Sequence, residues 1–468
     1  MTDGRGRMTL DIGQLVDPFE ARIVIDRDAS GAVAAARFDL SGLPRLDPVL
    51  AGRDVAGVPD TVKMLCGLCP VAHHLAGVRA LESAAPVGGE GSGAGGAVPA
   101  GADAVRRLLH HGSMIDQIAP RLLGLDRDAA VAFKSLGKTA MAAAGCPGHF
   151  PDVAVPGGVR GPADRGLVDE LADTAPAAAD RAMALATRAG DADGDWADRW
   201  DGWNIILAGA DGRPDPLGSH VLAVRGGERV LLAVADFDAR VDESRPGAAA
   251  PRPVLDLPGH GTVGYRVGPV AASRAAGRID GPVAAQARVL AESVAAVVDI
   301  VTDRRDDLLA AGAADPASGW KAGVPVRGVG AVDGPRGLLV HRYDGDGAGR
   351  LASCRILTPT AQNEPWLAAM LAEAVGSGGS GAGIVGARAS GAGADEPGTG
   401  VDESRNVGSG SSPGGQAASR AHPAMEAAVR AADPCLPISS APAGSMRLSV
   451  VDEPPASAPA GRSGSGTG

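Results

Sequence analysis

This chain of 468 residues has few aromatic side chains and no long apolar run. Aromatic residues make up 3% of the sequence, so the core must be built mainly from Ala, Val and Leu, which favours packed helices. The longest apolar runs, such as residues 230–235, are far shorter than the roughly 20 residues that cross a bilayer, and residues 1–14 lack the apolar segment of a signal peptide. We therefore expect no direct membrane insertion.

Basic residues and cysteines are also scarce. The 44 Lys and Arg are outnumbered by 55 Asp and Glu, which gives a net charge of −11. Nucleic-acid binding needs clustered basic side chains that displace counterions from phosphates, so we expect no nucleic-acid partner. Five cysteines are too few, and odd in number, for a disulfide scaffold. This usage fits a reducing compartment and predicts a cytoplasmic location.

Local patterns predict an α+β fold in which helices predominate. Residues 21–25 and 33–40 flank the turn-forming segment 28–31 and are typical of a β-hairpin. Apolar residues recur at helical spacing in four further segments, and two others look like strands. The helical segments are 74–84, 103–124, 164–190 and 282–313, and the strand-like ones are 220–236 and 338–358.

Three segments have a composition that cannot compensate for the entropy of ordering. Residues 87–101 and 376–421 are rich in Gly, Ala and Ser, and residues 442–468 have a similar bias. We interpret the first two as flexible insertions within one domain that spans residues 8–441, and the third as a disordered tail.

Two cysteine motifs lie near opposite ends of the chain: Cys66-Gly67-Leu68-Cys69 and Asp433-Pro434-Cys435. Thiolates three residues apart can bind one metal ion if the backbone turns between them, and they suit zinc, iron or nickel. The first pair should begin a helix, whose dipole lowers thiol pKa values. A pair of helix-start cysteines without metal, half of a zinc knuckle, and a structural role for Cys435 remain alternatives.

The surrounding motifs occur in one order along the chain. They are Gly42-Leu43-Pro44-Arg45, Leu65-Cys66-Gly67-Leu68-Cys69-Pro70-Val71-Ala72-His73, His149-Phe150-Pro151, Tyr265-Arg266-Val267-Gly268-Pro269, Gly334-Pro335-Arg336-Gly337, Pro359-Thr360-Ala361-Gln362-Asn363 and the run from Glu426 to Cys435. In this arrangement the chain resembles the large (alpha) subunit of [NiFe] hydrogenases, in their soluble, cytoplasmic, cofactor-linked branch. The resemblance implies a mainly helical fold with a central helix bundle and small peripheral β-sheets.

The resemblance also implies a nickel–iron centre, with cyanide and carbonyl ligands on the iron. Cys66 and Cys435 would bind nickel terminally, and Cys69 would bridge nickel to iron. His73 would donate a hydrogen bond to the bridging sulfur. Arg336 would pack against the diatomic ligands of the iron.

Two carboxylates complete the set of residues implied by the resemblance. Glu20 falls where the family has a glutamate that relays protons from a terminal thiolate. Asp47 falls where a carboxylate binds a structural magnesium ion. Glu20 and Arg336 are thus the candidate catalytic residues, and Asp47 joins the three cysteines as a candidate metal ligand.

The C-terminal motif departs from the family pattern. Ile438 stands where the family has a second bridging cysteine, and isoleucine cannot bind a metal. Ala441 stands where the family has the histidine after which a maturation protease cuts, a histidine that also belongs to the magnesium site. Three thiolates therefore remain of the four that hold a dinuclear centre.

Three functions follow as hypotheses. The first is a nickel-dependent hydrogenase large subunit that oxidises H2 or reduces protons. It would work with an iron–sulfur small subunit, hydrogenase maturation factors and a nicotinamide- or deazaflavin-linked module. The second is a hydrogenase-derived structural or assembly subunit without a functional nickel–iron centre. The third is a mononuclear nickel or zinc protein that uses Cys66, Cys69 and Cys435.

Overall fold

The protein is described by a computed structural model. The structure describes residues 20–39, 47–64, 66–86, 98–194, 196–243, 252–314, 320, 323–377, 419–420, 422–441 and 444–453. The predicted insertions lie largely outside these residues. Within the described ranges, no helix combines the length and the apolar character needed to cross a membrane.

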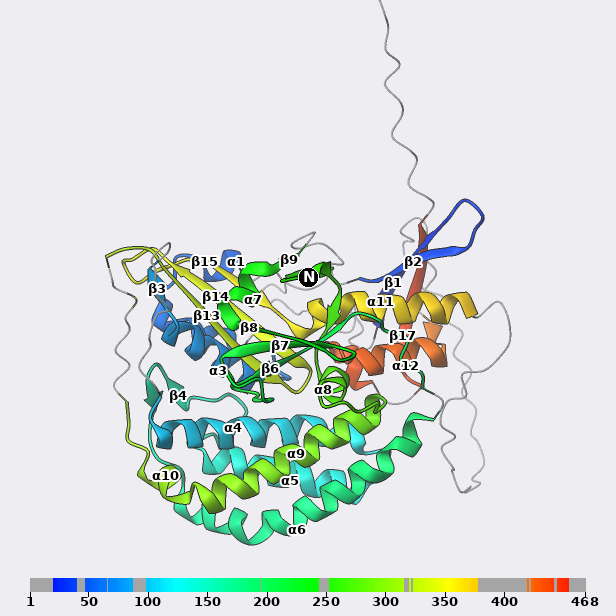
Figure 1. Cartoon of the computed structure of the whole chain (residues 1–468). Coiled ribbons are helices and arrows are strands. Elements are labelled where there is room, and N and C mark those ends of the chain that lie inside the picture. Colours follow the sequence, from blue (N-terminus) through cyan, green and yellow to red (C-terminus); the bar gives the residue numbers. More distant parts are fainter. Residues whose placement is uncertain are drawn as a thin grey trace, which may run out of the picture.

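Four long helices form a bundle, which occupies the lower part of Figure 1. They are α4 (Ala100–Ile118), α5 (Arg127–Ala143), α6 (Arg165–Ala189) and α9 (Pro282–Asp303). Side chains of Asp126 and Asp164 accept backbone N–H groups at the first turns of α5 and α6 and so cap these helices. At the contact of α4 with α5, a Cβ atom on Gly137 would lie 2.6 Å from the backbone nitrogen of Asp116, so glycine permits the close approach. The predicted central bundle is present.

The remaining helices lie outside the bundle. They are α1 (Asp47–Leu50), η2 (Val55–Gly57), α2 (Val58–Val62), α3 (Pro70–Glu82), η3 (Ala119–Leu122), η4 (Gly190–Asp193), α7 (Val234–Arg240), α8 (Pro269–Ala275), α10 (Arg305–Ala310), α11 (Pro359–Ser377), α12 (Pro423–Ala432) and η5 (Pro437–Ser440). The helical pattern at 282–313 thus forms two helices, α9 and α10. Helix α5 was not predicted from the sequence, although Ala129, Phe133 and Ala140 are buried in the bundle core.

Small sheets lie above the bundle in Figure 1. One has the order β15-β14-β13-β3 and another the order β12-β6-β7-β8; a three-stranded sheet has the order β11-β10-β9, and β4 pairs with β5. Their strands are β3 (Ala85–Pro86), β4 (Ala154–Val155), β5 (Gly158–Val159), β6 (Trp203–Ala208), β7 (His220–Arg225), β8 (Glu228–Ala233), β9 (Val241–Glu243), β10 (Pro253–Leu257), β11 (Gly261–Val263), β12 (Tyr265–Arg266), β13 (Val326–Gly334), β14 (Gly337–Gly345) and β15 (Leu351–Leu357). The predicted α+β class is confirmed.

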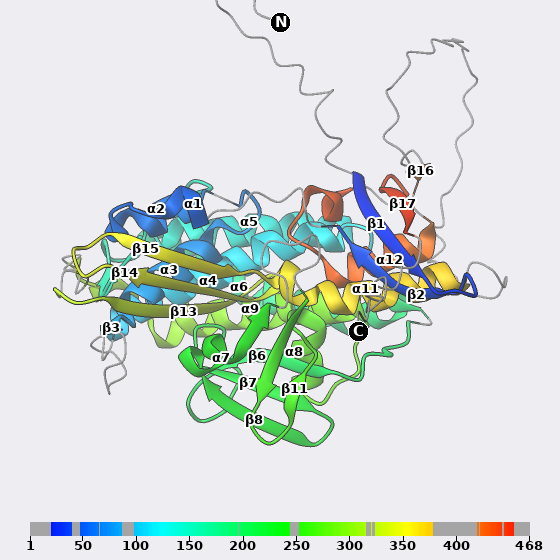
Figure 2. The same ribbon diagram turned by 90° about the horizontal axis from the view of Figure 1, so that it is seen from above.

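Helix α3 packs on β13 and β14, as Figure 2 shows. A Cβ atom on Gly328 would lie 1.9 Å from the carbonyl oxygen of Ala80, so the helix backbone lies directly on the strand. Arg79 fixes the register, because its Nε donates to the carbonyl of Ala331 at 2.9 Å. The packing of α3 on β13 and β14 therefore fixes which strand residues lie beside the start of this helix.

A sheet of order β16-β17-β1-β2 lies beside α11 and α12 in Figure 2. It contains the predicted hairpin, β1 (Glu20–Arg27) and β2 (Val33–Phe38), together with β16 (Ser419–Arg420) and β17 (Arg447–Glu453). Strand β17 pairs in parallel with β1 and falls within the segment for which the sequence predicted disorder. The difference has a physical reason: Met446 and Leu448 are buried in the adjoining core, and β1 supplies the hydrogen bonds. Residues 454–468 lie outside the described ranges.

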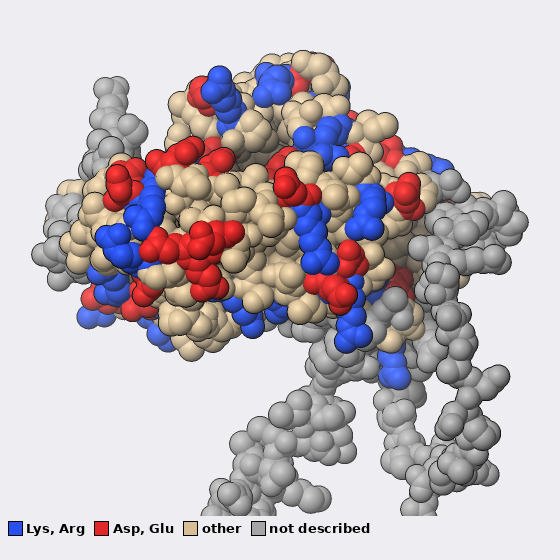
Figure 3. Space-filling model, turned by 90° about the horizontal axis from the view of Figure 1, so that it is seen from below, with Lys and Arg blue, Asp and Glu red and all other residues tan. Residues whose placement is uncertain are grey.

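Acidic and basic side chains alternate in small groups over the face shown in Figure 3. Ion pairs between neighbouring helices include those of Arg181 and Arg188 with Asp126. Such mixed charge does not form the continuous basic surface that attracts phosphates.

Candidate metal centre

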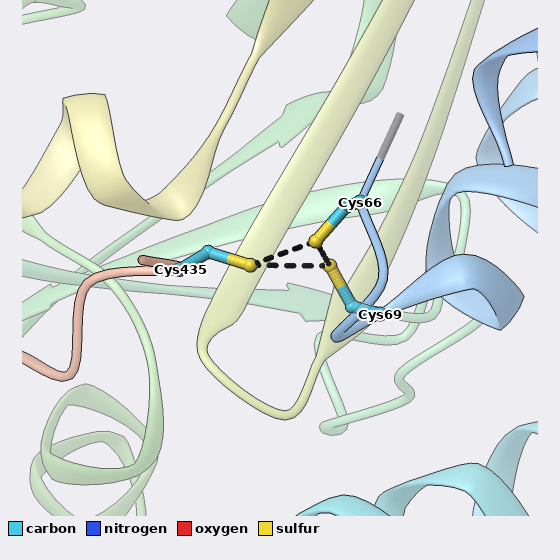
Figure 4. A group of neighbouring side chains, drawn as sticks. All are labelled: Cys66, Cys69 and Cys435. Carbon is cyan, nitrogen blue, oxygen red and sulfur yellow. Dashed lines mark hydrogen bonds between the residues drawn. The ribbon is translucent and has the colours of Figure 1, made fainter. Parts of the chain in front are cut away.

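The three cysteines of the two motifs lie together (Figure 4). The Sγ atom of Cys66 is 3.0 Å from that of Cys435 and 3.2 Å from that of Cys69. The third separation, between Cys69 and Cys435, is 3.5 Å. All three thiols are free and partly buried. They form the group of potential metal ligands found in the described part of the chain.

The first two cysteines are positioned by the start of α3. Cys69 is the N-cap of this helix, and Pro70 occupies the first helical position, where proline costs no hydrogen bond. The loop between the cysteines is held from outside, because Nε2 of His149 lies 2.7 Å from the carbonyl oxygen of Gly67 and can donate to it. The backbone turn that the motif requires is therefore supported by a second segment.

Cys435 is positioned by the end of α12. That helix ends at Asp433, which has a φ of 44° and so lies in the left-handed region. The backbone N–H of Cys435 donates to Oγ1 of Thr360, at the start of α11, at 2.7 Å. This hydrogen bond links the C-terminal motif to the helix that packs beside it.

The three sulfurs lie so close together that each changes the pKa values of the other two. Hydrogen bonds with Cys435 and Cys69 lower the pKa of Cys66 strongly. Hydrogen bonds with Cys435 and Cys66 raise the pKa of Cys69 well above its usual range, and the one with Cys66 raises the pKa of Cys435 to about 12. The cluster therefore favours a thiolate at Cys66 over one at Cys69 or Cys435. A metal ion would replace the protons shared by the sulfurs.

Arg336 lies buried beside the sulfurs, in the turn between β13 and β14. Its Nε is 3.5 Å from Oδ1 of Asp433, and Asp433 also pairs with Arg121 at 2.9 Å. Burial works against the charged guanidinium, but Asp433 and the three sulfurs outweigh it and raise the pKa of Arg336. The Nε and Nη1 atoms find no hydrogen-bond acceptor among the described residues. The site therefore offers a fixed positive charge with unused donors.

His73 faces the cluster from α3, one turn after Cys69. Hydrogen bonding by His73 contributes to the lowered pKa of Cys66, and the bond to the bridging sulfur that the resemblance implies stays a prediction. Its Nδ1 lies 3.1 Å from Nε2 of His341, whose Nδ1 lies 2.8 Å from the hydroxyl of Tyr343. His341 and Tyr343 are fully buried on β14.

The sequence also singled out Glu20, Asp47 and Ile438. Glu20 begins β1 and Asp47 begins α1, but the side chains of both lie outside the described residues. Ile438 is 1% exposed and packs in an apolar cluster with Trp366 and Met446. The proton-transfer role of Glu20 and the magnesium role of Asp47 stay predictions.

Four further residues at or near the site were given no role from the sequence: His149, Thr360, His341 and Tyr343. His149 and Thr360 lie within motifs of the resemblance, and His341 and Tyr343 follow the motif Gly334-Pro335-Arg336-Gly337 by a few residues, which was the available signal. Their contacts depend on how α3, β14 and α11 pack together, and no local pattern reports that packing.

Two hydrogenase subunits are similar to this chain over nearly their whole length. A vhu subunit of an F420-non-reducing hydrogenase from Methanococcus voltae is 25% identical over 409 residues, which cover 74% of this chain and 92% of the relative. The corresponding subunit from Methanocaldococcus jannaschii, of the same description, is 24% identical and is covered to 93%. No protein-family model matches the chain.

A solved structure of an NAD+-reducing [NiFe]-hydrogenase in the H2-reduced state superposes with a TM-score of 0.62. It is 22% identical, and the match covers 88% of this chain and 94% of that one. The fold predicted from the resemblance is thus found in a hydrogenase. The predicted resemblance is borne out: this chain is similar in sequence to A subunits of F420-non-reducing hydrogenases and in fold to a [NiFe] hydrogenase.

Proposed function

We propose that this chain is the metal-binding subunit of a hydrogenase-type oxidoreductase, with Cys66, Cys69 and Cys435 as metal ligands. One observation carries the proposal: three thiols from opposite ends of the chain meet within 3.5 Å under a buried arginine. Structural thiols have no need to gather in this way, since a single buried cysteine packs as a small apolar residue.

The donor set fits one thiophilic ion. Three thiolates leave a fourth coordination position open, which is the arrangement of a reactive rather than a purely structural site. Nickel and zinc both accept such ligands. The unused N–H groups of Arg336 fit a site in which an anionic ligand of the metal accepts hydrogen bonds.

The same donor set does not fit a nickel–iron pair held by two sulfur bridges. Ile438 provides no ligand and is packed among apolar side chains. Thiolate-bound nickel would supply the redox chemistry at this site. The chain itself would hold the ion through its cysteines, stabilise negative charge through Arg336 and orient one sulfur through His73. Glu20 would carry protons away, as the resemblance assigns.

Electrons would leave through an iron–sulfur small subunit, because five cysteines cannot hold both this site and a cluster of their own. A nicotinamide-linked module is the favoured electron acceptor. The structural neighbour is an NAD+-reducing enzyme, and the curated relatives are F420-non-reducing, which argues against a deazaflavin. We propose a cytoplasmic location, where thiols stay reduced, and loading by hydrogenase maturation factors.

A second candidate is a structural or assembly subunit that keeps the fold without redox chemistry. The buried position of Ile438 favours it, because an apolar contact there has replaced a potential ligand with core packing.

Metal analysis separates the two candidates. The chain is co-expressed with maturation factors and an iron–sulfur small subunit, then purified beside a Cys435→Ser variant. One nickel per chain, lost in the variant, together with H2-dependent dye reduction, would support the oxidoreductase. Infrared bands of cyanide and carbonyl would reveal iron despite Ile438. Co-purification of the small subunit with equal, negligible metal in both proteins would favour the structural role.

A further inference from the structure

A buried hydrogen-bond chain leads away from the cysteine cluster and ends at a tyrosine. Its members are Tyr343, His341 and His73, joined by contacts of 2.8 and 3.1 Å. His73 is 5% exposed and the other two are fully buried. These buried groups are shielded from water, so their hydrogen bonds must be made with one another or with other protein groups.

The tyrosine end sets the direction of the chain. The hydroxyl of Tyr343 lies in an apolar cluster that includes Leu50, Val58 and Trp320. Within the described residues, its hydrogen bond is the one to Nδ1 of His341. If Nδ1 were the donor, the hydroxyl proton would be buried without an acceptor, which folded proteins avoid. The hydroxyl therefore donates to Nδ1.

The direction then passes through both imidazoles. Burial lowers the pKa of His341 well below its usual value, so this ring is neutral and carries one proton. With Nδ1 as acceptor, the proton of His341 is on Nε2, which donates to Nδ1 of His73. An imidazole that accepts at Nδ1 carries its proton on Nε2, so this hydrogen-bond direction places the proton of His73 on Nε2.

We propose that Tyr343 and His341 are positioning residues that hold His73 in its Nε2–H tautomer, so that it donates a hydrogen bond to the Cys66 sulfur. His73 lies on α3 one turn after Cys69, and its ring is close enough to Cys66 to contribute, by hydrogen bonding, to the lowered pKa of that thiol. A donor on a metal-bound thiolate reduces the charge on the sulfur and tunes the metal. The opposite tautomer would turn a lone pair toward the thiolate and repel it.

Gly77 is part of this arrangement. It lies one turn after His73 on α3, and a Cβ atom there would be 3.0 Å from the Tyr343 hydroxyl. Because glycine leaves that space open, the tyrosine can reach under the helix to His341.

The chain also offers a matched control. It has two tyrosines, and Tyr265 is fully buried like Tyr343. Among the described residues, however, the Tyr265 hydroxyl has no hydrogen-bond partner. Tyr265→Phe and Tyr343→Phe thus remove the same atom from equally buried sites, and one of them breaks the chain.

The tautomer of His73 is measured first, in the reduced, metal-free, full-length protein. Long-range proton–nitrogen NMR correlations distinguish the two tautomers, and a His73→Gln spectrum assigns the signals. We expect the Nε2–H form in the wild type and in Tyr265→Phe, and a shift toward the Nδ1–H form in Tyr343→Phe. An unchanged His73 tautomer in Tyr343→Phe would overturn the proposal.

Cobalt(II) affinity is measured next, by chelator competition and sulfur-to-cobalt absorption. We expect Tyr343→Phe to bind cobalt(II) roughly tenfold more weakly, and Tyr265→Phe to match the wild type. Unchanged affinity despite a shifted tautomer would overturn the tuning role. This step rests on the proposed function. If the wild type itself binds no cobalt(II), the proposed function fails while the tautomer result still decides the hydrogen-bond chain.

Two variants of His341 cover the case in which Tyr343→Phe does not fold. The amide of His341→Gln can accept through its oxygen and donate through its nitrogen, so we expect it to keep the His73 tautomer and the cobalt(II) affinity. His341→Leu should lose both. Equal behaviour of the two variants, each with a native-like thermal melt, would overturn the proposal.

Discussion

Placing a cysteine at position 438 tests whether Ile438 occupies the position of a fourth metal ligand. Ile438 lies three residues after Cys435 in η5 and is 1% exposed, within a cluster that includes Phe38 and Trp366. Cysteine is smaller than valine and larger than alanine. The metal-free Ile438→Cys protein should therefore lose about 1–3 kcal/mol of stability, between the values typical of Ile→Val and Ile→Ala in a packed core.

The lost packing would be exchanged for a ligand. If position 438 adjoins the sulfurs, Ile438→Cys completes a four-thiolate set, and cobalt(II) should bind at least about tenfold more tightly, a gain of about 1.4 kcal/mol. At a free metal concentration of about 100 times the Kd of the variant, binding stabilises the variant by roughly 2.7 kcal/mol and the wild type, with its tenfold higher Kd, by roughly 1.4 kcal/mol. The variant should thus be less stable than the wild type without metal, and saturating metal should narrow this gap by about 1.3 kcal/mol.

Ile438→Val is the matched control, because it shortens the same side chain without adding a ligand. Urea unfolding followed by circular dichroism gives the stability of each metal-free protein, and cobalt(II) titration gives the affinity and the sulfur-to-cobalt absorption. Equal affinity and equal absorption per cobalt in the cysteine and valine variants would refute the reasoning. Position 438 would then not lie at the open corner of the site.

Three further changes address the residues around the sulfurs. Thr360→Val removes the hydroxyl that accepts the N–H of Cys435, which should cost about 1–3 kcal/mol in urea unfolding and weaken cobalt(II) binding; unchanged values would show that this bond does not position Cys435. Asp433→Asn leaves Arg336 buried without its carboxylate and should destabilise the protein by about 3–5 kcal/mol, whereas a loss below about 1 kcal/mol would mean that the sulfurs suffice as partners. Burial raises the pKa of Glu364 from 4.5 to about 7, so between these pH values the folded state binds a proton that the unfolded state has lost. The free energy of unfolding should therefore fall by about 3 kcal/mol as pH rises across that window. Glu364→Gln should flatten this pH dependence of the urea midpoint, and an unaltered dependence would assign it to other groups.

The sequence was most informative where a feature is local. The turn at 28–31 predicted the β1–β2 hairpin, and proline after Cys69 fits the observed start of α3. Helical spacing located α4, α6 and α9; the predicted range of α6 agrees within one residue at each end, whereas those of α4 and α9 run past the observed ends of these helices. The meeting of Cys66 with Cys435 is not local, since 369 positions separate them, and it was expected because of the family motifs.

Contacts between elements were not predictable in the same way. The strand pattern at 338–358 places His341 and Tyr343 on one face of β14, since they are two residues apart. Helical spacing likewise places His73 one turn after Cys69. Which face of the strand meets which turn of the helix depends on how closely α3 lies on β13, and that depends on glycines such as Gly328. Strand β17 was missed because its short apolar pattern forms a strand only when β1 is available beside it.

The packing around the cysteines bears on what a metal would contribute. In small zinc domains the metal is the scaffold, and its binding energy is folding energy. Here Cys69 is held by α3 against β13 and β14, whereas Cys435 is held by α12 and by its hydrogen bond to Thr360 on α11. Both supports belong to apolar cores built from many other residues. Metal affinity and fold stability should therefore be separable in this protein, so that a ligand variant such as Cys435→Ser loses the ion and keeps the fold.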